Sequence, residues 1–265
     1  MEEILRTLGD EDRVLDLGGG RGSLPDSLQA RAVILDIERP AGTPSHSFVQ
    51  GDAAALPFRP EVFRAVVSNH SLEHIEGLDA CLAEMGRVTA EGGSLFVSVP
   101  DSRTVSDKIY RWLGRGGGHV NPFPDDRALA ARIERSTGLP HHATRLLYTG
   151  YSILNAKNQA GRRQLKLWLF AGGHETFVRW LTLLCRLLDR LLGTRLSVYG
   201  WAFYFGPKVP VEASSQTNVC IRCGAGASES WITANCRISA FFGLRRYACA
   251  RCGTLNFLTA DSPAP

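Results

Sequence analysis

The stretch that most constrains the fold is residues 14–22, which read Val-Leu-Asp-Leu-Gly-Gly-Gly-Arg-Gly. An apolar run followed by an acid and a glycine-rich turn predicts a buried strand that ends in a tight loop. Glycine suits such a loop because a ligand can approach the backbone closely and φ can be positive. The dinucleotide fingerprint G-x-G-x-x-G would need glycine where Ser23 stands. The pattern is instead D-x-G-x-G-x-G, formed by Asp16, Gly18, Gly20 and Gly22.

This glycine pattern resembles motif I of the class I S-adenosylmethionine (SAM) methyltransferases, and further blocks of that family follow in order. An apolar strand over residues 32–36 ends in Asp36, and an acid at this place can accept both ribose hydroxyls of an adenosyl ligand. Residues 51–58 resemble the family's G-D-A-x-x-L-P-F stretch, whose acid and next backbone N–H read the adenine edge. Residues 63–75 resemble strand four with its S-N-H-x-L-E-H segment, and residues 91–100 resemble the turn and strand five.

The resemblance covers residues 1–208, points to methyltransferase type 11-like enzymes, and implies SAM as the cofactor. It implies an α/β fold with a Rossmann-like, seven-stranded methyltransferase sheet. Strands that alternate with helical segments predict a parallel α/β sheet independently of the family. Carried over residue by residue, the family pattern assigns cofactor binding to Asp16, Gly18, Gly20, Asp36, Asp52, Ala53, Ser68 and His70.

Local signals predict helices around this framework. Ser23 is expected to cap a helix after the glycine loop, with Pro25 in its first turn. Another helix is expected to begin near Asp125 or Asp126 and to end at Gly138.

A methyl group on a sulfonium is already activated, so the enzyme's main task is to align the nucleophile behind it. An oxygen or nitrogen nucleophile must also lose a proton, which invites a general base. His70, His74 and His119 are the histidines expected at the carboxyl ends of strands four and five. His119, in the glycine- and proline-rich loop 102–123, is the candidate catalytic base. The alternative is a loop histidine exposed to water.

The segment between the last two expected strands, at 141–150 and 196–206, is longer than the family's short connection. Residues 151–195 predict a helical insert, with one long helix from Thr176 to Leu192. Two interpretations of this insert stay open. Its helices pack on each other as a lid over the acceptor pocket, or they also lie on an anionic membrane surface. The polar stripe expected on the long helix comprises Arg179, Thr182, Arg186, Asp189 and Arg190.

Two C-x-x-C pairs predict a small zinc ribbon over residues 219–260, joined by a linker at 209–218. Four thiolates suit one tetrahedral Zn²⁺, and the long spacing between the pairs allows a β-hairpin. Cys236 lies within that hairpin and is expected to be spare. A redox dithiol is the weaker interpretation, because it needs a βαβ setting. The expected metal ligands are Cys220, Cys223, Cys249 and Cys252.

Charge is unevenly distributed along the chain. Residues 1–144 hold 21 acidic and 15 basic side chains, whereas residues 145–208 hold 2 acidic and 10 basic ones. The basic part suggests an acidic partner such as phospholipid, nucleic acid or a phosphorylated substrate. With neither a signal peptide nor an uncharged apolar run of ~18 residues, a cytoplasmic protein with peripheral membrane contact is expected.

The main functional hypothesis is therefore SAM-dependent methyl transfer to a small-molecule or lipid-linked acceptor. An alternative is an RNA-directed methyltransferase whose basic insert and zinc ribbon bind nucleic acid. A third hypothesis is a methyltransferase-like scaffold that binds SAM without turnover.

Overall fold

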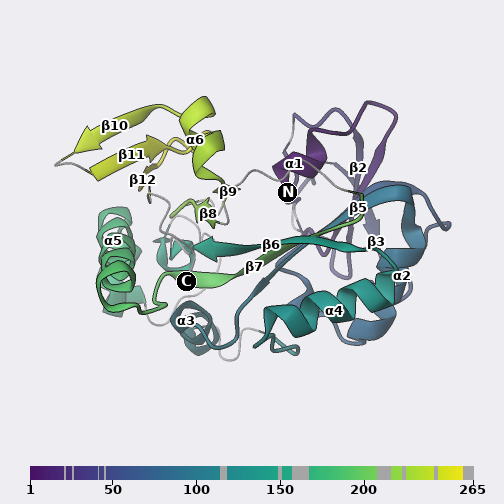
Figure 1. The fold of residues 1–265 in the computed structure, drawn as a ribbon, viewed down its shortest axis with the longest axis horizontal. Helices are drawn as coiled ribbons and strands as arrows, with labels where there is room; N and C mark the ends of the chain where they lie inside the picture. The colour runs from purple at the N-terminus through teal and green to yellow at the C-terminus, as the bar shows by residue number, and fades with distance from the viewer. Residues whose placement is uncertain are drawn as a thin grey trace. The chain divides into compact units, whose positions relative to one another are not determined.

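The computed structural model describes residues 1–20, 22–25, 27–40, 42–44, 46–113, 118–148, 151–156, 167–207, 216–222, 225–241 and 244–258. The chain divides into two compact units (Figure 1). The first unit contains Met1–Asp101, His119–Thr144 and Trp201–Val211. The second unit contains Ser102–Gly118, Arg145–Gly200 and Glu212–Pro265.

The first unit is built on a parallel sheet with strand order β3-β2-β1-β4-β5, continued by β7 and β6. Val14, Leu15 and Leu17 of the central strand β1 are fully buried, as expected for a parallel strand covered on both faces. The predicted α/β class with a central methyltransferase-like sheet is confirmed. The strands are β1 (Arg13–Leu17), β2 (Arg31–Asp36), β3 (Ser47–Gln50), β4 (Phe63–Asn69), β5 (Thr89–Pro100), β6 (His141–Tyr148) and β7 (Val198–Phe205).

The helices of the first unit are α1 (Glu2–Leu5), the short 3₁₀ turn η1 (Leu72–His74), α2 (Leu78–Val88) and α4 (Asp126–Thr137). The predicted caps of α4 are confirmed, because the Asp125 side chain accepts from the Ala128 N–H and Gly138 closes the helix at φ +70°. Helix α2 lies beside α4 (Figure 1), and a side chain at Gly86 would collide with the Thr137 backbone.

The prediction of a helix after the glycine loop is wrong, because the described residues between β1 and β2 form no helix. Residues 22–25 and 27–30 form turns and bends instead. The Ser23 N–H and hydroxyl both donate to the Asp16 carboxylate, at 2.7 Å each. Ser23 therefore orders the loop and does not cap a helix.

The second unit combines the insert with the cysteine-rich tail. Its helices are α3 (Val105–Leu113), which forms inside the expected loop, η2 (Ser152–Leu154), η4 (Leu167–Gly173), α5 (Glu175–Leu192) and α6 (Glu229–Asn235). Its strands are β8 (Gln216–Val219), β9 (Gly226–Ala227), β10 (Ile238–Phe241), β11 (Leu244–Ala248) and β12 (Leu255–Phe257).

Strands β8 and β9 extend the sheet beyond the expected seven strands. Residues Leu146–Tyr148 of β6 pair in parallel with Gln216–Asn218 of β8, and β9 pairs antiparallel with β8. Strands β10, β11 and β12 form a separate antiparallel sheet, which includes the expected hairpin. Residues 216–218, expected in the linker, are thus strand, and residues 208–215 lie outside the described residues.

The insert and the tail share one apolar core in the second unit. Tyr151 and Leu154 of the insert, Val178 and Cys185 of α5, and Ile221 of the tail are buried together. The insert is therefore packed on the cysteine-rich segment, which local sequence patterns did not predict. Over the described residues, helices are either too short or too polar to cross a membrane.

Candidate functional site

The glycine loop after β1 is seated against the chain that leaves β4. Gly18 has φ +66°, and a Cβ on it would overlap the Cβ of Ser71. The Ser71 hydroxyl donates to the Leu17 carbonyl at 2.8 Å and lies 2.6 Å from the Ser68 hydroxyl. Ser68, predicted to bind the cofactor, is therefore buried in the support of the loop. Ser71 supports the glycine loop and was not singled out from the sequence, because its partner Leu17 is 54 residues away.

Asp36, at the end of β2, holds the tip of the same loop. Its Oδ2 accepts the Gly20 N–H at 2.9 Å, and its Oδ1 accepts the Glu38 N–H at 3.1 Å. Gly20 has φ +55°, and a Cβ there would meet nothing within 4 Å. The structure therefore places the predicted ribose acceptor beside an open stretch of glycine backbone.

Asp16, near the end of β1, is fully buried and holds the glycine loop through hydrogen bonds. Both of its carboxylate oxygens accept from Ser23, and Gly19 passes so close that a Cβ would collide with the carboxylate. Burial raises the pKa of Asp16, and the bonds from Ser23 oppose that rise. These contacts give Asp16 a positioning role within the predicted set.

Asp52 and Ala53 follow β3, in the loop predicted to read adenine. Asp52 is exposed, and its Oδ1 accepts the Ala54 N–H at 2.8 Å. The loop is anchored from α2, because Glu84 accepts the Leu56 N–H at 2.8 Å and Arg87 donates to the carbonyls of Leu56 and Phe58.

The three candidate histidines gather after β4, together with Glu73. His70 has φ +56° and its N–H donates to the Ser98 carbonyl at 3.0 Å. Burial, reinforced by the charges of His119 and His74, lowers the pKa of His70 to about 4. Its Nδ1 lies 3.8 Å from Glu73 Oε1, so a neutral imidazole faces this carboxylate at neutral pH. The rings of His74 and His119 meet edge to face, with centroids 4.7 Å apart.

The segment that carries His119 is fastened to η1. The backbone N–H groups of Val120 and Asn121 donate to the Glu73 carbonyl at 2.8 and 3.1 Å. The Asn121 side chain donates to the carbonyls of Leu72 and Ile75 at 2.8 and 2.7 Å. Glu73 was not singled out from the sequence, although its place between two candidate histidine positions was a usable signal.

In the second unit, three of the four predicted metal ligands lie together. The Sγ atoms of Cys220, Cys249 and Cys252 are within 4.8 Å of one another, and those of Cys220 and Cys252 are 3.6 Å apart. Cys223 lies outside the described residues. Cys236 is half-buried and is not part of this cluster.

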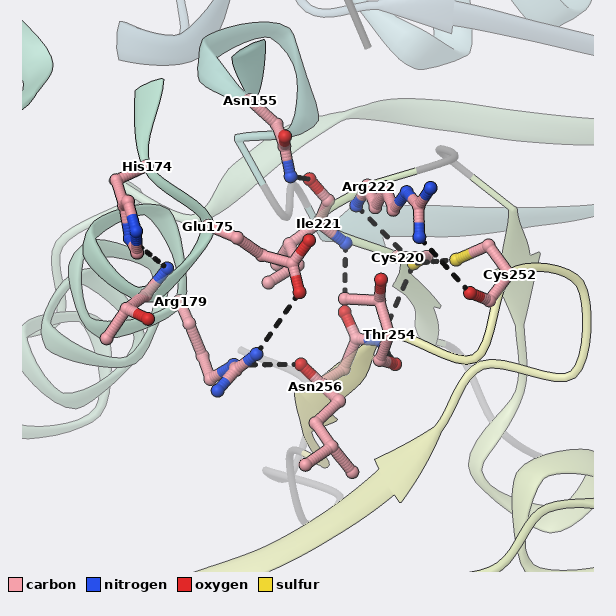
Figure 2. A network of polar contacts seen from close by, with 12 residues as sticks. Asn155, His174, Glu175, Arg179, Cys220, Ile221, Arg222, Cys252, Thr254 and Asn256 are labelled. Atoms are coloured by element: carbon pink, nitrogen blue, oxygen red, sulfur yellow. Dashed lines mark hydrogen bonds and ion pairs between the residues drawn. The ribbon is translucent and has the colours of Figure 1, made fainter. Parts of the chain in front are cut away.

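The surroundings of Cys220 suit a thiolate (Figure 2). The Arg222 N–H and the Asn256 side-chain amide point at its sulfur from 3.4 and 3.5 Å. Around Cys249, the N–H donates to the Thr254 carbonyl at 3.0 Å and the Gly253 N–H returns to the Cys249 carbonyl at 2.8 Å. Such turns with donors aimed at sulfur fit a metal-thiolate site, where the ligand is deprotonated.

Part of the polar stripe predicted on α5 is buried, whereas Arg190 of that stripe is exposed. Thr182 and Arg186 of the expected polar stripe are buried. Arg186 donates to Asn218 Oδ1 and to the Phe257 carbonyl, both at 3.1 Å. Arg179, labelled in Figure 2, donates to the Leu255 carbonyl at 2.9 Å. Arg179 and Arg186 of the polar stripe therefore pack on the cysteine-rich segment. The apolar residues of α5 that stay exposed are Phe177, Trp180, Leu184, Leu187, Leu191 and Leu192.

Comparison with known proteins identifies relatives of this chain. Residues 15–97 match the family model described as Methyltransferase domain. A demethylmenaquinone methyltransferase of Mycobacterium marinum is 31% identical over 157 residues, which cover 49% of this chain and 68% of the relative. The ubiquinone/menaquinone biosynthesis C-methyltransferase UbiE of Rhizobium leguminosarum is 32% identical over 103 residues, covering 32% of this chain and 40% of the relative.

Among solved structures, the [4+2]-cyclase SpnF matches with a TM-score of 0.50 and 17% identity, covering 77% of each chain. At this identity the likeness shows the fold alone. SpnF is named for a cyclisation, so the fold by itself does not determine the reaction.

Proposed function

Since the chain belongs to the methyltransferase-domain family of SAM-dependent enzymes, we propose that it methylates a lipid-linked small molecule of quinol type. The observation that carries the proposal is the glycine loop clamped between Ser71 and Asp36, in a chain related to quinone methyltransferases. The names of those relatives favour a small-molecule acceptor over RNA.

In the proposed cofactor site, Asp36 accepts the ribose hydroxyls next to the open backbone of Gly20. Asp52 and the Ala53 N–H read the adenine edge. Gly18 allows the close approach of loop and strand, while Asp16 and Ser68 support it from below. His70 forms a neutral wall of the pocket.

The candidate proton acceptor is His119, whose imidazole is held near His74 and Glu73. A quinol-type acceptor must lose a hydroxyl proton before it attacks the methyl group as a nucleophile. A base at the carboxyl end of the sheet suits that task.

The exposed apolar stripe of α5 supports an acceptor that is carried in lipid. Leu184 and Leu191, two turns apart on one face, are 54% and 76% exposed. Arg186 of the same helix packs within the second unit, and Arg190 remains exposed beside the apolar side chains. A helix with an apolar exposed face and basic neighbours can lie in the interface of an anionic membrane.

The cysteine cluster is proposed to hold one structural Zn²⁺, with Cys223 as the fourth ligand. Three thiols gathered by the fold and hydrogen bonds to the sulfur of Cys220 support this assignment. Zinc would stabilise a tail that has only a small core of its own, formed around Ile232 and Tyr247.

Incubation with methyl-labelled SAM and a reduced demethylated prenyl-naphthoquinone in detergent micelles tests the function. Label is expected in the quinol and to fall sharply in Asp36→Ala. Transfer of label to RNA, with none to the quinol, would overturn the proposal. SAM binding without transfer to any quinol-type acceptor would also contradict it.

A further inference from the structure

Glu73, His74 and His119 form a compact set of nitrogen and oxygen ligand atoms in the first unit. One ligand atom from each lies within 4.8 Å of the others. Two ligands of one ion with bonds of about 2.1 Å can lie at most about 4.2 Å apart, so a small side-chain adjustment would close the set. Two imidazoles and one carboxylate are a donor set that binds divalent transition metals and leaves coordination positions open.

The fold holds this set in place from both sides. Glu73 and His74 are neighbours on η1, and the chain next to His119 is fastened to η1 by the four hydrogen bonds from Val120 and Asn121. The segment carrying His119 thus cannot drift from η1 without breaking these bonds. Preorganised ligands lower the cost of binding an ion, because less conformational freedom is lost.

The three side chains differ in exposure in a way that suits a metal site open to solvent on one side. The Glu73 side chain is 2% exposed, His119 is half-buried and His74 is exposed. A charge as buried as that of Glu73 costs less when a cation coordinates it. The exposed imidazole marks a side from which an ion and a further ligand can enter.

The set also lies next to the proposed methyl-donor loop. Ser71, two residues before Glu73, donates to the carbonyl of Leu17, which directly precedes Gly18. We propose that Glu73, His74 and His119 bind a divalent cation of the Mn²⁺ to Zn²⁺ series, and that an oxygen of the methyl acceptor completes its coordination.

The role of the acceptor oxygen rests on the proposed function, whereas the binding of the cation does not. Coordination polarises the acceptor hydroxyl, whose proton leaves to water while the electron pair stays on the acceptor. A bound ion occupies the imidazole nitrogen of His119 that a general base would use. The ligand and base roles of His119 are therefore alternatives.

Mn²⁺ is a suitable probe because carboxylate, imidazole and water suit it better than thiolates, so the cysteine cluster competes little. Free Mn²⁺ is counted by electron paramagnetic resonance in titrations of the full chain. The variants are Glu73→Gln, His74→Asn and His119→Asn. The matched control is His141→Asn, whose ring bonds to Thr144 on β6, outside the set.

We expect one Mn²⁺ per wild-type chain, binding weaker by at least roughly tenfold in each of the three variants, and wild-type binding in the control. Wild-type binding no tighter than that of His119→Asn would overturn the site, as would an equal loss in His141→Asn. Calorimetric titration with SAM checks that each variant is folded. If Glu73→Gln does not fold, the Mn²⁺ affinity of His119→Asn decides whether the site exists. Mn²⁺ binding without methyl transfer would overturn the proposed function and leave the metal site standing.

Discussion

Asp36 accepts the backbone N–H of Gly20 at 2.9 Å, which ties the end of β2 to the tip of the glycine loop after β1. One carboxylate therefore shapes the loop beside the glycine backbone where we propose that the cofactor binds. Removal of this side chain tests the cofactor site directly.

Asp36→Ala is expected to weaken SAM binding by about 1.5–3 kcal/mol, because a charged hydrogen-bond acceptor is lost. Isothermal titration calorimetry on purified protein measures the change. Glu38→Ala is the control, since Glu38 contributes only its backbone N–H to Asp36. Equal affinities for the wild type and Asp36→Ala would exclude Asp36 as the ribose ligand.

Comparison of Gly18→Ala with Gly20→Ala separates the cost of a positive φ from the cost of a steric clash with Ser71. Both positions have positive φ, so alanine costs each variant about 1–2 kcal/mol of unfolding free energy. At Gly18 the new methyl group also overlaps Ser71, which adds about 1–3 kcal/mol. Urea denaturation should rank Gly18→Ala below Gly20→Ala, and equal midpoints would argue against the close packing of Gly18 on Ser71.

Removal of the zinc ion that we propose at the cysteine cluster should destabilise α5 as well as the cysteine-rich tail. Ile221, next to Cys220, is buried in the same core as Val178 and Cys185 of α5. Chelation should therefore speed amide hydrogen exchange in α5 as well as in β8, as measured by mass spectrometry. Cys220→Ser without a chelator should reproduce the pattern. Faster exchange in the tail with unchanged exchange in α5 would contradict this coupling.

Arg186→Met is expected to lower the unfolding free energy by about 1–3 kcal/mol. The change leaves Asn218 Oδ1 and the Phe257 carbonyl buried without this donor. Burial lowers the pKa of Arg186, because the guanidinium is removed from water. Arg190→Met, on the exposed side of α5, is the control and should stay within ~0.5 kcal/mol of wild type.

Sedimentation with vesicles tests whether the exposed stripe of α5 meets lipid. The wild type should sediment with anionic vesicles, and Leu184→Gln combined with Leu191→Gln should remain in the supernatant. Ile37→Gln, which removes an apolar side chain that is 68% exposed in the first unit, should behave as wild type. Wild-type protein that stays in the supernatant with both anionic and neutral vesicles would refute membrane contact.

The sequence by itself determined the features whose physical cause is local. The strand, acid and glycines of residues 14–22 predicted the loop after β1, and Asp125 and Gly138 predicted both ends of α4. Each of these signals acts within a few residues, through backbone conformation or a cap. The order of the blocks along the chain then indicated the sheet and the cofactor.

Only the tertiary structure decided which surfaces meet. Arg186 of the polar stripe of α5 faces inward because its acceptors lie 32 and 71 residues further along the chain. Ser23 donates two hydrogen bonds to Asp16, so it does not cap a helix. Glu73 lies close to His74 and His119 because the N–H groups of Val120 and Asn121 donate to its carbonyl. These outcomes depend on partners that are distant in sequence, and a periodic pattern carries no information about which partner will cover a face.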